Sequence, residues 1–138
     1  MARSFFDANI LRYGNDAFDP HKNEIATDLI ARHRARRETV FTIQVLQEHF
    51  VNAVGKLKVD VVLTWRRVEL FSRFELVLPD VALLLAAIDL RRLHSISFWD
   101  AMMVQAARVA GRATLFSEDL NAGRTIAGVK IVNPFASV

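Results

Sequence analysis

The chain has 138 residues, which is the length of one ordinary globular domain spanning residues 1–138. Hydrophobic residues make up 52% of it and charged residues 24%, so a packed core is expected and wholesale disorder is excluded. The lack of cysteine excludes disulfides, thiolate metal sites and thiol nucleophiles, and it fits a reducing cytosol. The net charge of +3 favours polyanionic partners only slightly.

The apolar runs predict a soluble, cytoplasmic protein without a membrane span. The N-terminal segment meets a charge before the apolar region of a signal peptide could form. The longest apolar run, residues 81–88, is far shorter than the ~20 residues that a membrane helix needs.

Short apolar segments and helical patterns alternate along the first half of the chain. Phe5 and Phe6 predict a first strand that ends at Asp7. Asp19 followed by Pro20 predicts the start of a helix that reaches about residue 37, because an Asp cap and a first-position Pro both favour helix initiation. Residues 40–42 predict a short strand, after which Thr42 would cap a helix over residues 43–54 that Gly55 closes.

The second half continues the alternation. Residues 60–71 and 80–93 predict two helices, separated by a strand at 75–78. Ser97 begins another helix that runs to about residue 110, with Gly111 as its C-cap. Two final strands are predicted at residues 113–116 and 129–132. Such alternation indicates an α/β sandwich with a mostly parallel sheet, in which ligands sit beyond the carboxyl ends of the strands.

Two acids, Asp7 and Asp119, follow predicted strands and are therefore expected near one another. Asp7 is alternatively the cap of a short helix beginning near Asn9, and Asp119 is alternatively a turn acid ahead of a glycine-containing loop. If they form a site, Asn9 would steady the Asp7 carboxylate or a metal-bound water. Ser117 would orient Asp119 through its hydroxyl.

Two further acids lie on predicted helices. Asp100 stands in a helix that is apolar nearly all round, which predicts a buried carboxylate in need of a partner. Ser97 and Asp100 also have the spacing of a capping box, and both interpretations hold together. Glu48 lies opposite the apolar face of its helix, among amide side chains, and is alternatively a solvated acid. That apolar face consists of Leu46, Phe50, Ala53 and Leu57.

Four carboxylates held close together predict a bound divalent cation. Their mutual repulsion would raise some of their pKa values unless a cation neutralised them. Ligands that are all oxygen atoms select Mg²⁺ or Mn²⁺ over zinc. One or two such ions would activate a water for attack on phosphorus. Glu118, beside Asp119, is an undecided fifth acid.

A dense basic run occupies residues 32–37. It reads either as a solvated helix end or as a rim that contacts phosphates around an acidic site. In the second interpretation Arg34, Arg36 and Arg37 would contact the phosphates of a bound polyanion.

Together these segments resemble the PIN-domain family, and within it the VapC-like toxins of toxin–antitoxin pairs. The likeness covers essentially the whole chain, and the order and spacing of four stretches carry it. They are Phe5-Phe-Asp-Ala-Asn-Ile-Leu11, Thr42-Ile-Gln-Val-Leu-Gln-Glu-His-Phe50, Ser97-Phe-Trp-Asp-Ala-Met102 and Leu115-Phe-Ser-Glu-Asp-Leu120.

The resemblance implies a small three-layer α/β/α sandwich and cleavage of RNA that depends on Mg²⁺ or Mn²⁺. It implies an acidic set of Asp7, Glu48, Asp100 and Asp119, in which the three Asp residues hold the metal and Glu48 completes the shell or orients the water. Glu118 stands where many members have a non-acidic residue, which leaves the number of ligands open. A homodimer and a small antitoxin partner are further implications.

Two alternatives remain. The first is a PIN-like module that binds RNA or regulates without cutting it, against which the presence of all four acids argues. The second is a phosphate-processing enzyme with Asp7 as its nucleophile. Such sites often place a second Asp two residues further on, where this chain has Asn9.

Overall fold

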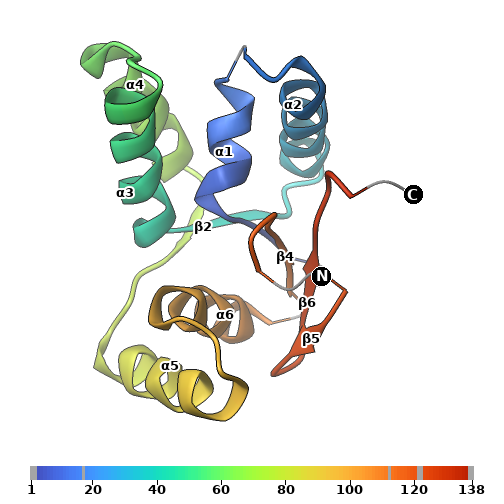
Figure 1. The fold of residues 1–138 in the computed structure, drawn as a ribbon. Coiled ribbons are helices and arrows are strands. Elements are labelled where there is room, and N and C mark those ends of the chain that lie inside the picture. The colour runs from blue at the N-terminus through green and yellow to red at the C-terminus, as the bar shows by residue number, and fades with distance from the viewer. Residues whose placement is uncertain (1–2, 17, 112, 121–122, 137–138) are drawn as a thin grey trace.

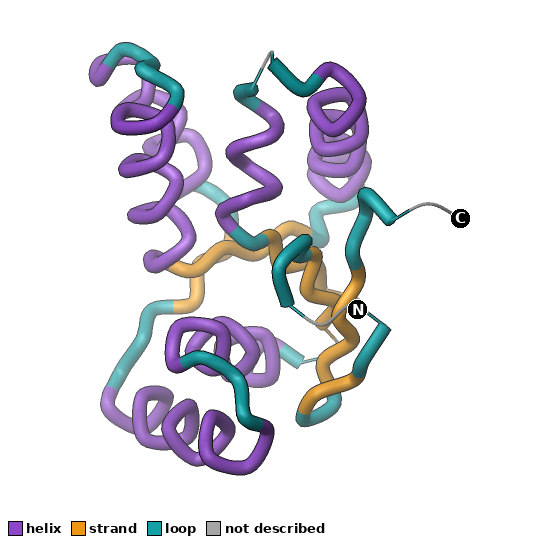
Figure 2. The backbone as a smooth tube through the Cα atoms, in the orientation of Figure 1, coloured by secondary structure: helices purple, strands orange, loops and turns teal. Residues whose placement is uncertain are grey.

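A six-stranded sheet forms the centre of the computed structural model, which describes residues 3–16, 18–111, 113–120 and 123–136. The strand order is β3-β2-β1-β4-β6-β5, and every neighbouring pair is parallel except β5 and β6. The strands are β1 (Arg3–Phe6), β2 (Thr39–Thr42), β3 (Glu75–Val77), β4 (Ala113–Phe116), β5 (Thr125–Ile126) and β6 (Val129–Val132). Figure 2 shows them as one band between two groups of helices.

Helices cover both faces of this sheet, which makes the fold the α/β sandwich that the sequence predicted (Figure 1). One group consists of α1 (Ala8–Gly14), α2 (Pro20–Ala35), α3 (Ile43–Val51) and α4 (Val61–Ser72). The other consists of α5 (Val81–His94) and α6 (Phe98–Ala110). Of these two, α6 contacts β1, β4 and β6, and α5 packs mainly on α6. No helix of the described residues is both long enough and apolar enough to cross a membrane.

Side-chain caps fix where the helices begin. Asp19 accepts a hydrogen bond from the Lys22 N–H and precedes Pro20, as predicted. Thr42 caps α3 through the Val45 N–H. Ser97 caps α6, which ends at Gly111 with a φ of 77°, a left-handed value that suits glycine.

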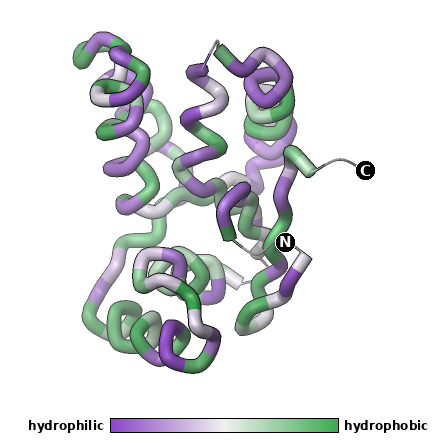
Figure 3. Tube along the Cα trace, viewed as in Figure 1, coloured by the Kyte–Doolittle hydropathy of each residue, from purple (hydrophilic) through white to green (hydrophobic). Residues whose placement is uncertain are grey.

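The core lies on both faces of the sheet, as expected for parallel strands buried from both sides. Phe5, Phe41, Leu115 and Ile131 are each at most 1% exposed. Apolar side chains also remain at the surface. Figure 3 shows that α5 is hydrophobic over most of its length, yet Val81 is 70% exposed.

The short helix that the sequence offered as the alternative for Asp7 is present as α1, capped by Asp7. The structure adds two features that the sequence did not predict. The short strand β5 precedes β6. The helix predicted over residues 43–54 ends at Val51 and continues as a π-helical turn, Asn52–Lys56. Phe50, expected to face inward, is 38% exposed, while His49 is fully buried.

Candidate functional site

Asp7 lies at the carboxyl end of β1 and is the most enclosed of the predicted acids, with 8% of the residue exposed. Its Oδ1 accepts a hydrogen bond of 2.6 Å from the Ala8 N–H, so the residue caps α1. Its Oδ2 accepts a bond of 2.7 Å from the Ser117 hydroxyl. The cap and the site are therefore compatible, because each uses a different carboxylate oxygen.

Burial raises the pKa of Asp7 from 3.8 to about 6, even though the bonds from Ser117 and Ala8 lower it. The negative charges of Glu48 and Asp100 raise this pKa further. A carboxyl with a pKa near neutrality at the ligand-binding edge of a parallel sheet marks a candidate functional site.

The fold explains why these acids approach one another. β1 and β4 pair in register from Arg3–Ala113 to Phe6–Phe116, so the next residues, Asp7 and Ser117, meet at the same edge. Helix α6 leads into β4, and α3 leaves β2, so the first turn of each helix begins at that carboxyl edge. Asp100 is in the first turn of α6, and Glu48 is in the second turn of α3.

Asn9 joins the two strand-end acids. Its Nδ2 donates to Asp119 Oδ2 at 3.0 Å and, more weakly, to Asp7 Oδ2 at 3.4 Å. Its Oδ1 is buried and has no hydrogen-bond partner among the described residues. A buried carbonyl oxygen without a donor, beside two carboxylates, fits a position that a cation or its bound water would occupy.

Ser117 ties the loop after β4 to this pair. Its fully buried hydroxyl donates to Asp7 and accepts from the main-chain N–H groups of Asp119 and Leu120, each at 3.3 Å. Its contact with Asp119 is therefore through the backbone, and the Asp119 side chain itself is exposed.

Gln44 connects Glu48 to the main chain at Trp99, the residue before Asp100. The Gln44 amide donates to Glu48 Oε1 at 3.0 Å and to the Trp99 carbonyl at 3.3 Å. It thus links α3 to the first turn of α6. Glu48 is half-buried rather than fully solvated.

The expected burial of Asp100 is wrong in part. The middle of α6 is buried, but Asp100 is half-buried and Trp99 beside it is 61% exposed. The reason is that the first turn of α6 lies at the open edge of the sheet. The Asp100 N–H donates to the Ser97 hydroxyl at 3.1 Å, which is half of the predicted capping box.

Glu118 has other partners than the predicted acids. Its Oε1 accepts from the Tyr13 hydroxyl at 2.9 Å, and its Oε2 pairs with Lys22. The Lys22 ammonium also lies 4.6 Å from the centre of the Tyr13 ring. These contacts anchor the loop after β4 to α1 and α2, and neither Tyr13 nor Lys22 was singled out from the sequence.

The donor chemistry of the site fits a hard divalent ion, since its oxygens come from carboxylates and one amide. Within the four ranges that the structure describes, however, no three His, Asp or Glu side chains surround a common point closely enough to hold a metal ion. Asp7 and Asp119 are instead spaced by the Asn9 amide.

The basic run lies at the other edge of the sheet. Residues 32–37 end α2 and precede β2, and β2 runs parallel to β1. Arg34, Arg36 and Arg37 are exposed there, separated from Asp7 by the length of a strand, roughly 13 Å. The structure therefore does not bring them beside the acids.

The fold is similar to that of known proteins of solved structure. No protein-family model and no curated protein matches the chain. Among solved structures, a chain of a toxin–antitoxin complex from Klebsiella pneumoniae has a TM-score of 0.67, with 18% identity over 96% of this chain and 98% of that one.

Two further solved structures give the same result. A chain of DNA-bound VapBC from Salmonella typhimurium has a TM-score of 0.66, and one of VapBC2 from Rickettsia felis, bound to a promoter DNA fragment, has 0.62. Both are 17% identical and cover 95% of this chain and 97% of theirs. At such identities the likeness is one of fold, and the α/β sandwich that the resemblance implied is confirmed.

Proposed function

We propose that this protein is a metal-dependent endoribonuclease, acting in the cytoplasm as the toxin of a toxin–antitoxin pair. Mg²⁺ or Mn²⁺ would be its cofactor, and Asp7, Glu48, Asp100 and Asp119 would form its active site.

The observation that carries the proposal is the environment of Asp7. Its buried carboxylate is held by Ser117 and Ala8, and the charges of Glu48 and Asp100 help to raise its pKa to about 6. An arrangement that leaves acids repelling one another is unfavourable unless a cation relieves it. The fold shared with chains of toxin–antitoxin complexes supports the biological part of the proposal.

Each residue of the proposed active site would have its own role in RNA cleavage. A bound ion would supply an activated water and neutralise the charge that develops on the leaving oxygen. Asp7, Asp100 and Asp119 would hold the ion, with Ser117 keeping Asp7 in place and Asn9 setting the position of Asp119. Glu48, oriented by Gln44, would complete the shell or accept the proton of the attacking water.

Two exposed apolar surfaces support the expected antitoxin and homodimer partners, because such patches mark protein contacts. One is a groove of about 440 Å³ between α3 and α4, lined by Phe50, Trp65 and neighbours. The other is the outer face of α5, where Val81, Leu85 and Ile88 are exposed by 70, 57 and 45%.

The proposal is tested by incubating the protein with single-stranded RNA and Mn²⁺, with EDTA as the negative control. We expect Asp100→Asn to lower the cleavage rate by about 100-fold, while Asp89→Asn on the surface of α5 leaves it unchanged. Equal cleavage by wild type and Asp100→Asn would contradict the site. Binding of RNA without ion-dependent cleavage would favour the non-catalytic alternative.

A further inference from the structure

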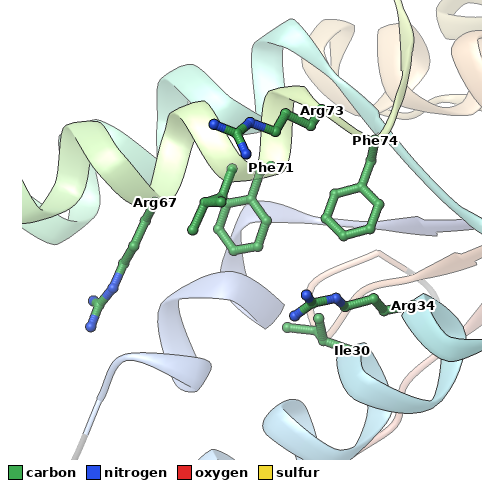
Figure 4. A pocket seen from close by; sticks show the side chains of 7 residues that line it. Ile30, Arg34, Arg67, Phe71, Arg73 and Phe74 are labelled. Carbon is green, nitrogen blue, oxygen red and sulfur yellow. The ribbon is translucent and has the colours of Figure 1, made fainter.

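A pocket of about 330 Å³ lies between α2 and α4, away from the acidic site. Three arginines line it, Arg34, Arg67 and Arg73, over an apolar floor (Figure 4). The floor consists of Ile30, Leu70, Phe71 and Phe74. Its two rings are fixed from below, because Phe71 and Phe74 pack on Phe41 with ring centroids 5.2 and 5.7 Å apart.

The positive charge of this pocket is largely uncompensated. Within the described residues, Arg34 and Arg67 have no carboxylate within ion-pairing distance, and Arg67 instead donates to the Asn15 side-chain oxygen at 2.7 Å. Arg73 pairs with Glu69 at 2.9 Å, but its side chain is 67% exposed, so that pair is weak. Three guanidinium groups thus share one opening with a single carboxylate.

The hollow continues beyond this opening. A second pocket of about 240 Å³ shares Ile30, Arg34 and Phe71 with the first and extends along α2 to Gly14 and Asn15 at the end of α1. The two pockets adjoin at these three residues, and together they are called the groove below. A ligand that fits it is an extended chain carrying negative charge and flat or apolar groups.

We propose that this groove binds single-stranded RNA, with phosphates on Arg34 and Arg73 and a base against Phe71 and Phe74. Planar guanidinium groups match phosphate oxygens, and aromatic floors accept bases whatever their sequence. Figure 4 shows Arg34 and Arg73 on either side of the opening, with the two rings between them. The volume suits one nucleotide, since small-ligand pockets begin at about 300 Å³.

The groove would be a second contact site for the RNA substrate, apart from the acidic site. The inference therefore rests on the proposed function. Arg34 ends α2, and Phe74 directly precedes β3, so the pocket lies at the amino edge of the sheet. Asp7 lies at the carboxyl edge, roughly 13 Å away along a strand. A dinucleotide held at the acids would not reach Arg34, whereas a longer RNA would.

The test is the affinity of a fluorescein-labelled RNA, measured by anisotropy in EDTA so that no cleavage occurs. The variant Arg34→Ala/Arg73→Ala removes one arginine that has no acid partner and one that pairs with an acid. The matched control, Arg91→Ala/Arg92→Ala on α5, does the same, because Arg92 pairs with Asp89 and Arg91 has no such partner among the described residues. All four side chains are exposed, so both variants should fold.

We expect the groove variant to bind long RNA about tenfold more weakly than the control. The slope of log affinity against log salt concentration should become shallower by about 0.7 per lost phosphate contact. Equal affinity of the two variants for long RNA would overturn the inference. So would loss of binding to a poly-glutamate peptide with RNA binding unchanged, which would assign the groove to an acidic protein segment.

The experiment separates this inference from the proposed function. RNA binding that depends on Arg34 and Arg73, in a protein that cleaves nothing, would support the groove and refute the nuclease. Ion-dependent cleavage with no effect of the two arginines would do the reverse.

Discussion

Replacement of Asp7 by Asn should stabilise the metal-free protein. A rise of the Asp7 pKa from 3.8 to about 6 corresponds to about 3 kcal/mol of destabilisation at neutral pH, at 1.36 kcal/mol per unit. Asn removes the charge but keeps an oxygen for the Ala8 N–H, as a good helix cap does. Loss of one accepted hydrogen bond offsets about 1 kcal/mol, which leaves a net gain of about 2 kcal/mol.

The destabilisation caused by Asp7 depends on pH. The folded state binds the Asp7 proton more tightly than the unfolded state, so the destabilisation is complete above pH 6 and disappears below pH 3.8. Thermal unfolding in EDTA should therefore show Asp7→Asn melting roughly 8 °C above wild type at about pH 8. At about pH 4 the difference should shrink to the hydrogen-bond loss alone.

Asp89→Asn is the control, because that carboxylate is exposed and forms only a surface pair with Arg92. Added Mn²⁺ should stabilise wild type more than Asp7→Asn and so narrow the gap. If Asp7→Asn is no more stable than Asp89→Asn at the higher pH, ionisation of the buried Asp7 carboxyl does not destabilise the folded protein, and the prediction is wrong.

Three other changes probe single contacts. Ser117→Ala removes the hydroxyl that lowers the pKa of Asp7, so that pKa should rise above 6 in an NMR titration of the carboxyl carbon; no change would exclude the bond. Burial and Arg67 lower the pKa of His49 to about 4, so the His49 contribution to stability falls as the pH drops from 6.5 to 4, while the Asp7 contribution rises in wild type and variant alike. The urea stability of His49→Phe should therefore increase relative to wild type as the pH falls, and a difference that does not change with pH would contradict this. Lys22→Met frees Glu118, and amide exchange at Asp119 and Leu120 should become about fivefold faster, whereas Lys56→Met should leave it unchanged; equal rates would show that the ion pair does not hold the loop.

Much of the fold follows from short-range patterns in the sequence. Asp19 with Pro20, Thr42, Ser97 and Gly111 mark helix ends through their own hydrogen bonds and backbone geometry, which do not depend on distant residues. The strands at 113–116 and 129–132 have the predicted bounds.

Features set by tertiary contacts were less predictable. β5 has two residues, too few for a periodic pattern, and it exists only because it pairs with β6. On the predicted inward face of α3, Leu46 is buried as expected but Phe50 is exposed. His49 is buried instead, because that helix contacts both α1 and α4. The apolar composition of α6 likewise could not show that its first turn lies at an open edge.

Some contacts of the acidic site could be predicted from the sequence and others could not. Asp7 and Ser117 meet because adjacent parallel strands end together, which an alternating pattern predicts. The bridge by Gln44 and the anchoring of Glu118 by Lys22 depend on how helices pack, and neither leaves a signal in the sequence. The basic run is separated from the acids because β2 is parallel to β1, which places Arg34 and Asp7 at opposite edges of the sheet.

Binding of Mn²⁺ tests the central claim most directly, and electron paramagnetic resonance measures it without any RNA. Wild type should bind the ion, and each of Asp7→Asn, Glu48→Gln, Asp100→Asn and Asp119→Asn should weaken binding by at least about tenfold, with Asp89→Asn unchanged. A wild-type protein that does not bind Mn²⁺, or four variants that bind it as tightly as Asp89→Asn, would contradict a shared divalent-ion site at the carboxyl edge of the sheet.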